Sequence, residues 1–121
     1  MRNRNSQVRT TKRKLSKCKG VCRTYNAIQY AYADILEKDP SVISFECNVL
    51  LSDFEIEGEY TTDFVITNES GELVIRECVS RDLIGKPKNV KLMDASRRYW
   101  NRRGSTDWGM VTNAKAWSDP V

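Results

Sequence analysis

Acidic, basic and thiol side chains gather in the stretch YTTDFVITNESGELVIRECVSRDL, which spans residues 60–83. Asp63 lies in one short apolar run, and Arg76, Glu77 and Cys78 lie in the next one. Oxygen ligands on neighbouring strands can hold Mg²⁺, which polarises a phosphate and helps to deprotonate water. The stretch therefore raises the hypothesis of a metal-dependent nuclease site. It offers a cysteine, however, where a lysine would serve that chemistry.

The strand register decides which of these side chains share a face. Residues 76 and 78 of a strand point to one face, and Glu77 points to the other together with Ile75. A shift by one residue would turn Glu77 toward Asp63 and form a two-carboxylate metal site. In the unshifted register, Arg76 can instead form a charge-assisted pair with Asp63 in place of a metal.

A first helix is expected from Asn26, which is a favourable N-cap residue, to the region of Pro40, which cannot continue a helix. Helical spacing places five apolar or aromatic residues along one face of it: Ile28, Ala31, Tyr32, Ile35 and Leu36.

The remaining pattern predicts three strands, a second helix and a last strand. The strands, at about 42–51, 61–67 and 73–79, are separated by short turns and should form an antiparallel meander. A basic amphipathic helix is expected over 88–103, and a strand over 107–113 can then lie parallel to a neighbour. This order predicts an α/β fold with a restriction-endonuclease-like αβββαβ core, a mixed central sheet flanked by helices.

Three blocks of the sequence carry a resemblance to a known family: LEKDPSVISFE, YTTDFVIT and KLMDASRRYWNRRGSTDWGMVTN. They are similar to the N-terminal nuclease domain of the TnsA family, from about residue 25 to residue 113. TnsA proteins are the endonuclease partners of a DDE transposase in cut-and-paste transposons. The resemblance implies a PD-(D/E)xK fold, and a division into a basic flexible arm (1–23), a TnsA-like nuclease-fold domain (24–113) and a tail (114–121).

The resemblance also implies site positions, which we carry over one at a time. The family uses a helix Glu, a strand Asp and a (Gln/Glu)-x-Lys motif on the next strand. Asp63 matches, but the helix Glu falls on Gln29, and the motif falls on Arg76 and Cys78. Because a soft thiol is a poor Mg²⁺ ligand and Gln29 brings no charge, we expect a degenerate catalytic site that lacks the matching Glu and Lys. Glu77 is a further candidate, Asp63 is the candidate metal ligand, and the expected cofactor is none or Mg²⁺.

Positive charge is concentrated at the N-terminus. The net charge is +4, from 20 basic and 16 acidic residues. Residues 1–23 contain nine Lys or Arg and no acid, so the rest holds 20 − 9 = 11 basic against 16 acidic residues, a net −5. A cationic arm suits a polyanion such as DNA, because neutralised phosphates release counterions. A solubilising tail or a segment bound to an acidic protein face is the alternative.

The segment SRRYWNRR (96–103) interleaves four arginines with Tyr99 and Trp100. It can grip phosphates and stack on bases, or its aromatic pair can pack against the sheet. The predicted nucleic-acid-binding residues are Arg2, Arg4, Arg9, Lys12, Arg13, Lys14, Lys17, Lys19, Arg23, Arg97, Arg98, Arg102 and Arg103.

The four cysteines are Cys18, Cys22, Cys47 and Cys78, and the sequence has no histidine. The C-x₃-C spacing of the first two is looser than a zinc knuckle, and the other two form no second pair. Four free thiols are therefore expected, with an all-cysteine zinc site as the alternative. The sequence contains no apolar run of membrane-spanning length and no secretory signal, which favours a cytoplasmic protein without membrane contact.

Three functions fit these observations. The first is a TnsA-like nuclease-fold protein of a mobile element or phage that binds DNA, a protein partner such as a transposase, or both, with a degenerate site. The second is an active Mg²⁺-dependent DNA endonuclease that cuts at transposon ends. The third is a repurposed nuclease fold that acts as a protein-binding inhibitor or adaptor of a host defence complex. The oligomeric state is left open.

Overall fold

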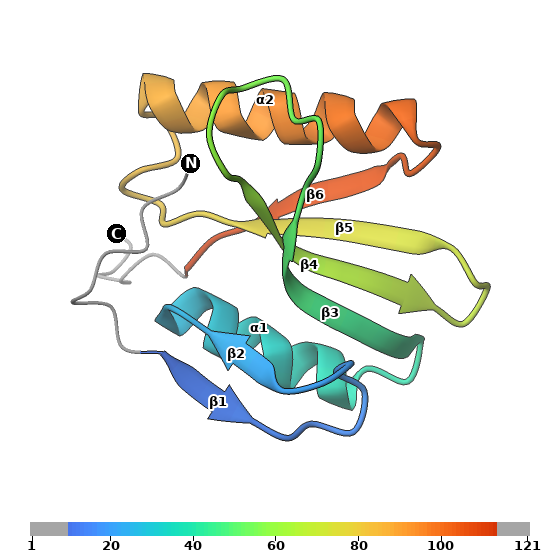
Figure 1. Ribbon diagram of the computed structural model, residues 1–121. Coiled ribbons are helices and arrows are strands. Elements are labelled where there is room, and N and C mark those ends of the chain that lie inside the picture. The colour runs from blue at the N-terminus through green and yellow to red at the C-terminus, as the bar shows by residue number, and fades with distance from the viewer. Residues whose placement is uncertain (1–9, 114–121) are drawn as a thin grey trace, which may run out of the picture.

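The computed structural model describes residues 10–113 and shows an α/β protein with a mixed four-stranded sheet and two helices. Helix α2 lies along one side of the sheet and α1 along the other (Figure 1). The elements in chain order are β1 (Thr11–Arg13), β2 (Cys22–Thr24), α1 (Ala27–Lys38), β3 (Val42–Leu50), β4 (Thr61–Asn68), β5 (Leu73–Cys78), α2 (Pro87–Arg102) and β6 (Asp107–Val111).

The main sheet has the strand order β3-β4-β5-β6. Strands β3, β4 and β5 are antiparallel neighbours, and β6 pairs with β5 in parallel after the chain has passed through α2. The antiparallel meander and the parallel last strand are therefore confirmed, as is the order αβββαβ from α1 onward.

Helix α1 begins and ends where the sequence predicts, but its inward face agrees only in part with the expected one: Leu36, Ile28 and Tyr32 pack against the core. The side chain of Asn26 accepts a hydrogen bond from the backbone N–H of Gln29 at 2.9 Å, and the helix ends one residue before Asp39. Its buried residues are Gln29, Ala33 and Leu36, whereas Ile35 is 57% exposed. The expected apolar face is wrong at Ala31 and Ile35, which are exposed, because the helix buries polar Gln29 and Ala33 instead.

The segment 10–23 differs from the flexible arm that its basic composition predicts. Strands β1 and β2 pair as an antiparallel ribbon, with Lys12 opposite Arg23 and Arg13 opposite Cys22. In Figure 1 this ribbon lies against α1, and it forms a two-stranded sheet of its own. Residues 1–9 and 114–121, which belong to the predicted arm and tail, lie outside the described part of the chain.

Acidic side chains of α1 hold this ribbon in place. Arg13 forms an ion pair with Asp34 at 2.6 Å, and its guanidinium lies 3.6 Å from the centre of the Tyr30 ring. The carboxylate of Glu37 accepts hydrogen bonds from the backbone N–H groups of Ser16 and Lys17, both at 3.0 Å. Arg13 and the backbone of Lys17 are thus held by α1, through contacts that the local sequence pattern does not encode.

The chain between β1 and β2 also covers the outer edge of β3. Lys17 accepts a hydrogen bond from the N–H of Phe45, and Lys19 donates one to the carbonyl oxygen of Phe45, both at 2.9 Å. Cys18 thereby forms a parallel bridge with Phe45. Strand edges left open tend to recruit other chains, so this pairing protects the end of the sheet.

Each face of the sheet packs a separate apolar cluster. Phe45, Phe64 and Leu36 belong to the cluster on the α1 side, and Ile75 and Trp100 belong to the cluster on the α2 side. None of the helices in residues 10–113 is long and apolar enough to cross a membrane.

The aromatic pair of α2 packs inward. Tyr99 and Trp100 are buried, and the indole N–H of Trp100 donates to the hydroxyl of Thr62 at 2.9 Å. Of the two alternatives for this segment, packing against the sheet is the one observed.

Candidate functional site

Asp63 lies where β4 and β5 separate. The regular pairing of these strands runs from Thr67 opposite Leu73 to Phe64 opposite Arg76. Asp63 comes just before Phe64 and is buried, with only 1% of its surface exposed. A buried carboxylate needs hydrogen bonds to offset the loss of hydration, so its contacts define the site.

Three of the positions implied by the resemblance meet here. The side-chain N–H of Gln29 donates to one oxygen of Asp63 at 2.6 Å, and the backbone N–H of Cys78 donates to the other at 2.5 Å. Helix α1, strand β4 and the end of β5 thus supply one residue each. The sequence predicts this convergence through the resemblance, and the geometry brings the three together.

The orientation of the Gln29 amide is set by its other contacts. Its nitrogen also donates to the side-chain oxygen of Asn48 at 2.8 Å, and its oxygen accepts the backbone N–H of Tyr25 at 2.9 Å. Because the oxygen is occupied by an N–H donor, the NH₂ group must face Asp63. Asn48 adopts a left-handed backbone conformation (φ 55°) and donates to the carbonyl of Arg23 at 2.7 Å.

Sequence reasoning missed Tyr25 and Asn48 as members of this network. Asn48 could have been found from the sequence, because asparagine is unfavourable inside a strand of apolar and β-branched residues and so indicates a special role. The sequence contains no comparable signal for Tyr25, because the group that contacts Gln29 is its backbone N–H.

Glu77 faces the opposite side of the sheet. It is fully buried, and its carboxylate accepts hydrogen bonds from the hydroxyls of Tyr60 at 2.8 Å and Ser96 at 2.5 Å. The backbone N–H of Asp63 donates to it as well, at 2.9 Å. With Arg76 paired to Phe64, the one-residue shift that would bring Glu77 beside the carboxylate of Asp63 is not adopted.

Arg76 points toward β6. Its guanidinium forms an ion pair with Asp107 at 2.9 Å and donates to the carbonyl of Ile75 at 2.9 Å. An added Cβ on Gly109 would lie 3.4 Å from this side chain, so Arg76 rests over the glycine. The expected ion pair between Arg76 and Asp63 is not observed, because β6 supplies the carboxylate instead.

The donor set around Asp63 does not fit Mg²⁺. This cation takes oxygen ligands in near-octahedral geometry. Asp63 instead faces two N–H donors, from Gln29 and Cys78, and the carbonyl oxygen of Gln29 is turned to Tyr25. The arrangement is one that stabilises a buried carboxylate by hydrogen bonding.

The arginines of α2 contact protein groups. Arg98 binds Glu55 through two nitrogens, at 2.6 and 3.0 Å, and Arg102 reaches the same carboxylate at 3.3 Å. Hydrogen bonding from Arg98 lowers the pKa of Glu55. Arg97 lies 3.9 Å from Asp94. Arg103 stacks over the ring of Tyr99 at 3.5 Å.

The predicted DNA-binding residues of the ribbon fall into two groups. Arg13 and Lys17 anchor the ribbon, since Lys17 donates to the carbonyl of Asp39 at 2.6 Å and Arg13 binds α1. Four others have exposed side chains: Lys12, Lys14, Lys19 and Arg23. Arg2, Arg4 and Arg9 lie outside the described residues.

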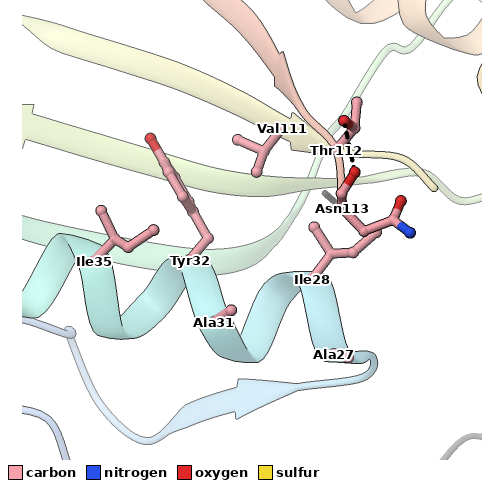
Figure 2. Close-up of a pocket in the computed structure, with 8 residues that line it drawn as sticks. All are labelled: Ala27, Ile28, Ala31, Tyr32, Ile35, Val111, Thr112 and Asn113. Atoms are coloured by element: carbon pink, nitrogen blue, oxygen red, sulfur yellow. Dashed lines mark hydrogen bonds between the residues drawn. The ribbon is translucent and has the colours of Figure 1, made fainter. Parts of the chain in front are cut away.

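A shallow groove lies between α1 and the end of β6 (Figure 2). It has a volume of about 250 Å³ and is lined mainly by apolar side chains, among them Ile28, Tyr32, Ile35 and Val111. Thr112 and Asn113 close one end of it in Figure 2. An apolar lining suits carbon-rich groups and not phosphates, so the groove does not provide a DNA site.

The chain was also compared with known proteins. It matches no protein-family model, and no curated protein matches it.

Proposed function

We propose that this protein is a TnsA-like nuclease-fold protein that binds DNA and does not cut it. The observation that carries the proposal is the direction of the Gln29 amide, whose NH₂ group donates to Asp63 at 2.6 Å. A nuclease of the family would place a second carboxylate at this position to hold a metal ion. Here the amide occupies that space and donates a hydrogen bond to the carboxylate of Asp63.

The arrangement of elements supports the nuclease-like ancestry. The residues that the resemblance assigns to the site, Gln29, Asp63 and Cys78, come from three elements distant in sequence and lie in contact. The mixed sheet with α1 on one face agrees with the expected core. Loss of the metal site with retention of its surroundings fits a protein that keeps the shape of a nuclease without the reaction.

The basic ribbon is the surface we assign to DNA. Strand residues alternate in direction, so Lys12, Lys14 and Arg23 share the outer face, while Arg13 and Cys22 point inward. The ribbon adjoins the Asp63 network through the carbonyl of Arg23, which accepts a hydrogen bond from the Asn48 side chain. Exposed lysines and arginines on one face bind phosphates by counterion release, without sequence preference.

Substitution of the outer face tests this assignment. The variant Lys12→Gln/Lys14→Gln/Arg23→Gln removes three exposed charges and leaves the anchors Arg13 and Lys17 intact. We expect affinity for a duplex to fall on the order of 100-fold at 0.1 M salt, and the slope of log K against log salt to become shallower by about 3. Fluorescence anisotropy with a labelled duplex across a salt series measures both quantities.

A matched control removes three exposed lysines elsewhere. Lys86, Lys88 and Lys91 lie at the start of α2, so replacing all three by Gln changes the net charge equally. This control variant should keep most of the affinity of the parent protein for the DNA duplex. Equal losses in the two variants would contradict a ribbon-specific contact. If the unsubstituted protein fails to bind DNA at low salt, the proposal falls, and a protein-binding adaptor becomes the better candidate.

A further inference from the structure

Three cysteines lie together beneath the ribbon. The sulfur of Cys47 is 4.0 Å from that of Cys18 and 4.0 Å from that of Cys22, and all three sulfur atoms lie within 4.8 Å of one another. Cys18 and Cys22 are buried, and Cys47 is half-buried. Among residues 10–113, this is the only set of three or more cysteines or carboxylates whose ligand atoms converge in this way.

The spacing matches a tetrahedral thiolate site. A Zn–S bond of about 2.3 Å places two sulfurs of a tetrahedron about 3.8 Å apart. A disulfide would need about 2.05 Å instead. We propose that Cys18, Cys22 and Cys47 bind a soft divalent cation of the zinc class, with three protein thiolates and a fourth position filled from solvent.

The three ligands come from separate segments that the fold fixes independently. Cys18 is held by its bridge to Phe45, Cys22 begins β2, and Cys47 lies within β3. The fold already holds the three sulfurs close together. Binding a cation should therefore need little rearrangement and cost little conformational entropy. Cys78 belongs to the core beside β4 and is not part of the cluster.

The charge around the cluster favours an anionic thiolate complex. Three thiolates and one divalent cation leave one net negative charge. Arg13 is the direct cross-strand partner of Cys22, and its Nε is buried with no hydrogen-bond acceptor among the described residues. A buried donor of this kind indicates a missing partner, and a thiolate of the proposed complex would offer an acceptor and a countercharge close to it.

Burial opposes ionisation of the Cys18 and Cys22 thiols when no cation is bound. Burial raises the pKa of Cys22 to about 11, with Cys47 adding to the rise and Arg13 opposing it. Burial also raises the pKa of Cys18, again with Cys47 adding to it. Each thiol that binds the cation as a thiolate releases its proton to solvent as its metal–sulfur bond forms.

A bound cation would join the ribbon to the sheet. Cys22 belongs to β2 and Cys18 to the connection before it, whereas Cys47 belongs to the edge strand β3. The site would therefore clip the ribbon to the edge of β3 with bonds stronger than the surrounding hydrogen bonds. This inference does not rest on the proposed DNA binding.

Metal titration of the whole chain tests the proposal. Purified, reduced protein is freed of metal and titrated with Zn²⁺ while its melting temperature is followed, and with Co²⁺ while its visible absorption is followed. We expect one cation per chain, a rise in melting temperature with Zn²⁺, and the sulfur-to-cobalt and intense ligand-field bands of tetrahedral thiolate cobalt. Mass spectrometry under native conditions gives the stoichiometry.

Two variants distinguish the cluster from general thiol binding. Cys47→Ser should abolish the cobalt bands and the Zn²⁺-dependent rise, whereas Cys78→Ser should retain both, with circular dichroism confirming that each variant is folded. If Cys47→Ser does not fold, the metal stoichiometry and the cobalt spectrum of the unsubstituted protein decide whether the thiolate site exists. Absence of thiolate-cobalt bands in that protein, equal loss in Cys78→Ser, or a disulfide among the three residues would overturn the proposal.

Discussion

The carboxylates of Asp63 and Glu77 take the place of backbone hydrogen bonds between β4 and β5. Glu77 accepts the N–H of Asp63, and Asp63 accepts the N–H of Cys78, where the regular pairing has ended at Phe64. The two strands can separate at this point without leaving these amides unpaired. The carboxylates are therefore structural parts of the sheet.

Removal of Asp63 should destabilise the fold. In Asp63→Ala, the amide of Gln29 and the N–H of Cys78 lose a buried acceptor, and each unsatisfied donor costs about 1–3 kcal/mol. We expect a loss of about 2–4 kcal/mol in the free energy of unfolding, measured by urea denaturation.

A solvent-exposed aspartate provides the control for this measurement. Asp82→Ala lies in the connection after β5 and should change stability little. Metal-binding carboxylates crowded in an active site often behave oppositely, because their removal relieves repulsion. An Asp63→Ala protein as stable as the parent, or more stable, would therefore contradict a structural role.

Gln29→Glu should convert a stabilising contact into a repulsive one. The new carboxylate would lie where the amide now donates to Asp63 at 2.6 Å, and like charges at that distance oppose each other. We expect the melting temperature to fall in EDTA and to recover in millimolar Mg²⁺, because a cation bound between two carboxylates stabilises the folded state. Differential scanning fluorimetry with and without Mg²⁺ measures both effects.

The parent protein is the internal reference for that experiment. Its melting temperature should not respond to Mg²⁺ in the same range. A rise comparable to that of Gln29→Glu would show that the site with Gln29 already binds the cation.

Sequence reasoning reached part of this site and missed the rest for identifiable reasons. The resemblance located Gln29, Asp63 and Cys78, but the side of the sheet taken by Glu77 depends on register, which the apolar pattern left open. The partner of Arg76 was missed because Asp107 is distant in sequence and is brought alongside by parallel pairing with β6.

At the scale of elements, the ribbon β1–β2 depends on the carboxylates of α1. Glu37 accepts two backbone N–H groups and the hydroxyl of Ser16, and these contacts, led by the Ser16 hydroxyl, lower its pKa from the ordinary 4.5. A lowered pKa in the folded state means that the contribution to stability is present above pH 4.5. It is lost as the pH falls through the folded-state pKa.

Glu37→Gln should therefore weaken the ribbon contact at neutral pH and reduce its acid sensitivity. We expect faster cleavage by trypsin within residues 14–19 at pH 7, because the ribbon opens more often. We also expect a smaller fall in melting temperature between pH 6 and pH 3 than in the parent. Glu69→Gln, an exposed residue in the turn after β4, is the control. Indistinguishable behaviour of the two variants would contradict the assigned role of Glu37.

The elements themselves were predictable where the signals are local. Asn26 marks the start of α1, and alternating or β-branched runs mark β3, β4 and β5. The ribbon was missed because its strands are three residues long and its stabilising contacts, such as Arg13 with Asp34, span 21 positions. The inward face of α1 was misjudged in part, because Gln29, a polar residue, lies at the centre of a buried network.

Across the whole molecule, the two faces of the sheet carry different polar networks. The α1 face holds the contact between Gln29 and Asp63, next to the ribbon that presents Lys12 and Arg23 outward. The α2 face holds Glu77, whose contacts with Tyr60 and helix α2 are fully buried. The exposed basic residues of the ribbon and the Asp63 network are thus close together on one side of the molecule.

This layout also changes how DNA binding should be tested. Deletion of residues 1–23 would remove the basic charge, but it would also remove β1, two cysteines and the cover of the β3 edge. Charge substitutions on the outer face of the ribbon separate binding from folding.

The central claim is that the Asp63 site does not cleave DNA. The most direct measurement is the nicking of supercoiled plasmid in Mg²⁺ or Mn²⁺ by the parent protein and by Asp63→Ala at equal concentrations. We expect no metal-dependent nicking by the parent above the level of the Asp63→Ala protein. Nicking by the parent that requires the metal and disappears in a folded Asp63→Ala protein would contradict it.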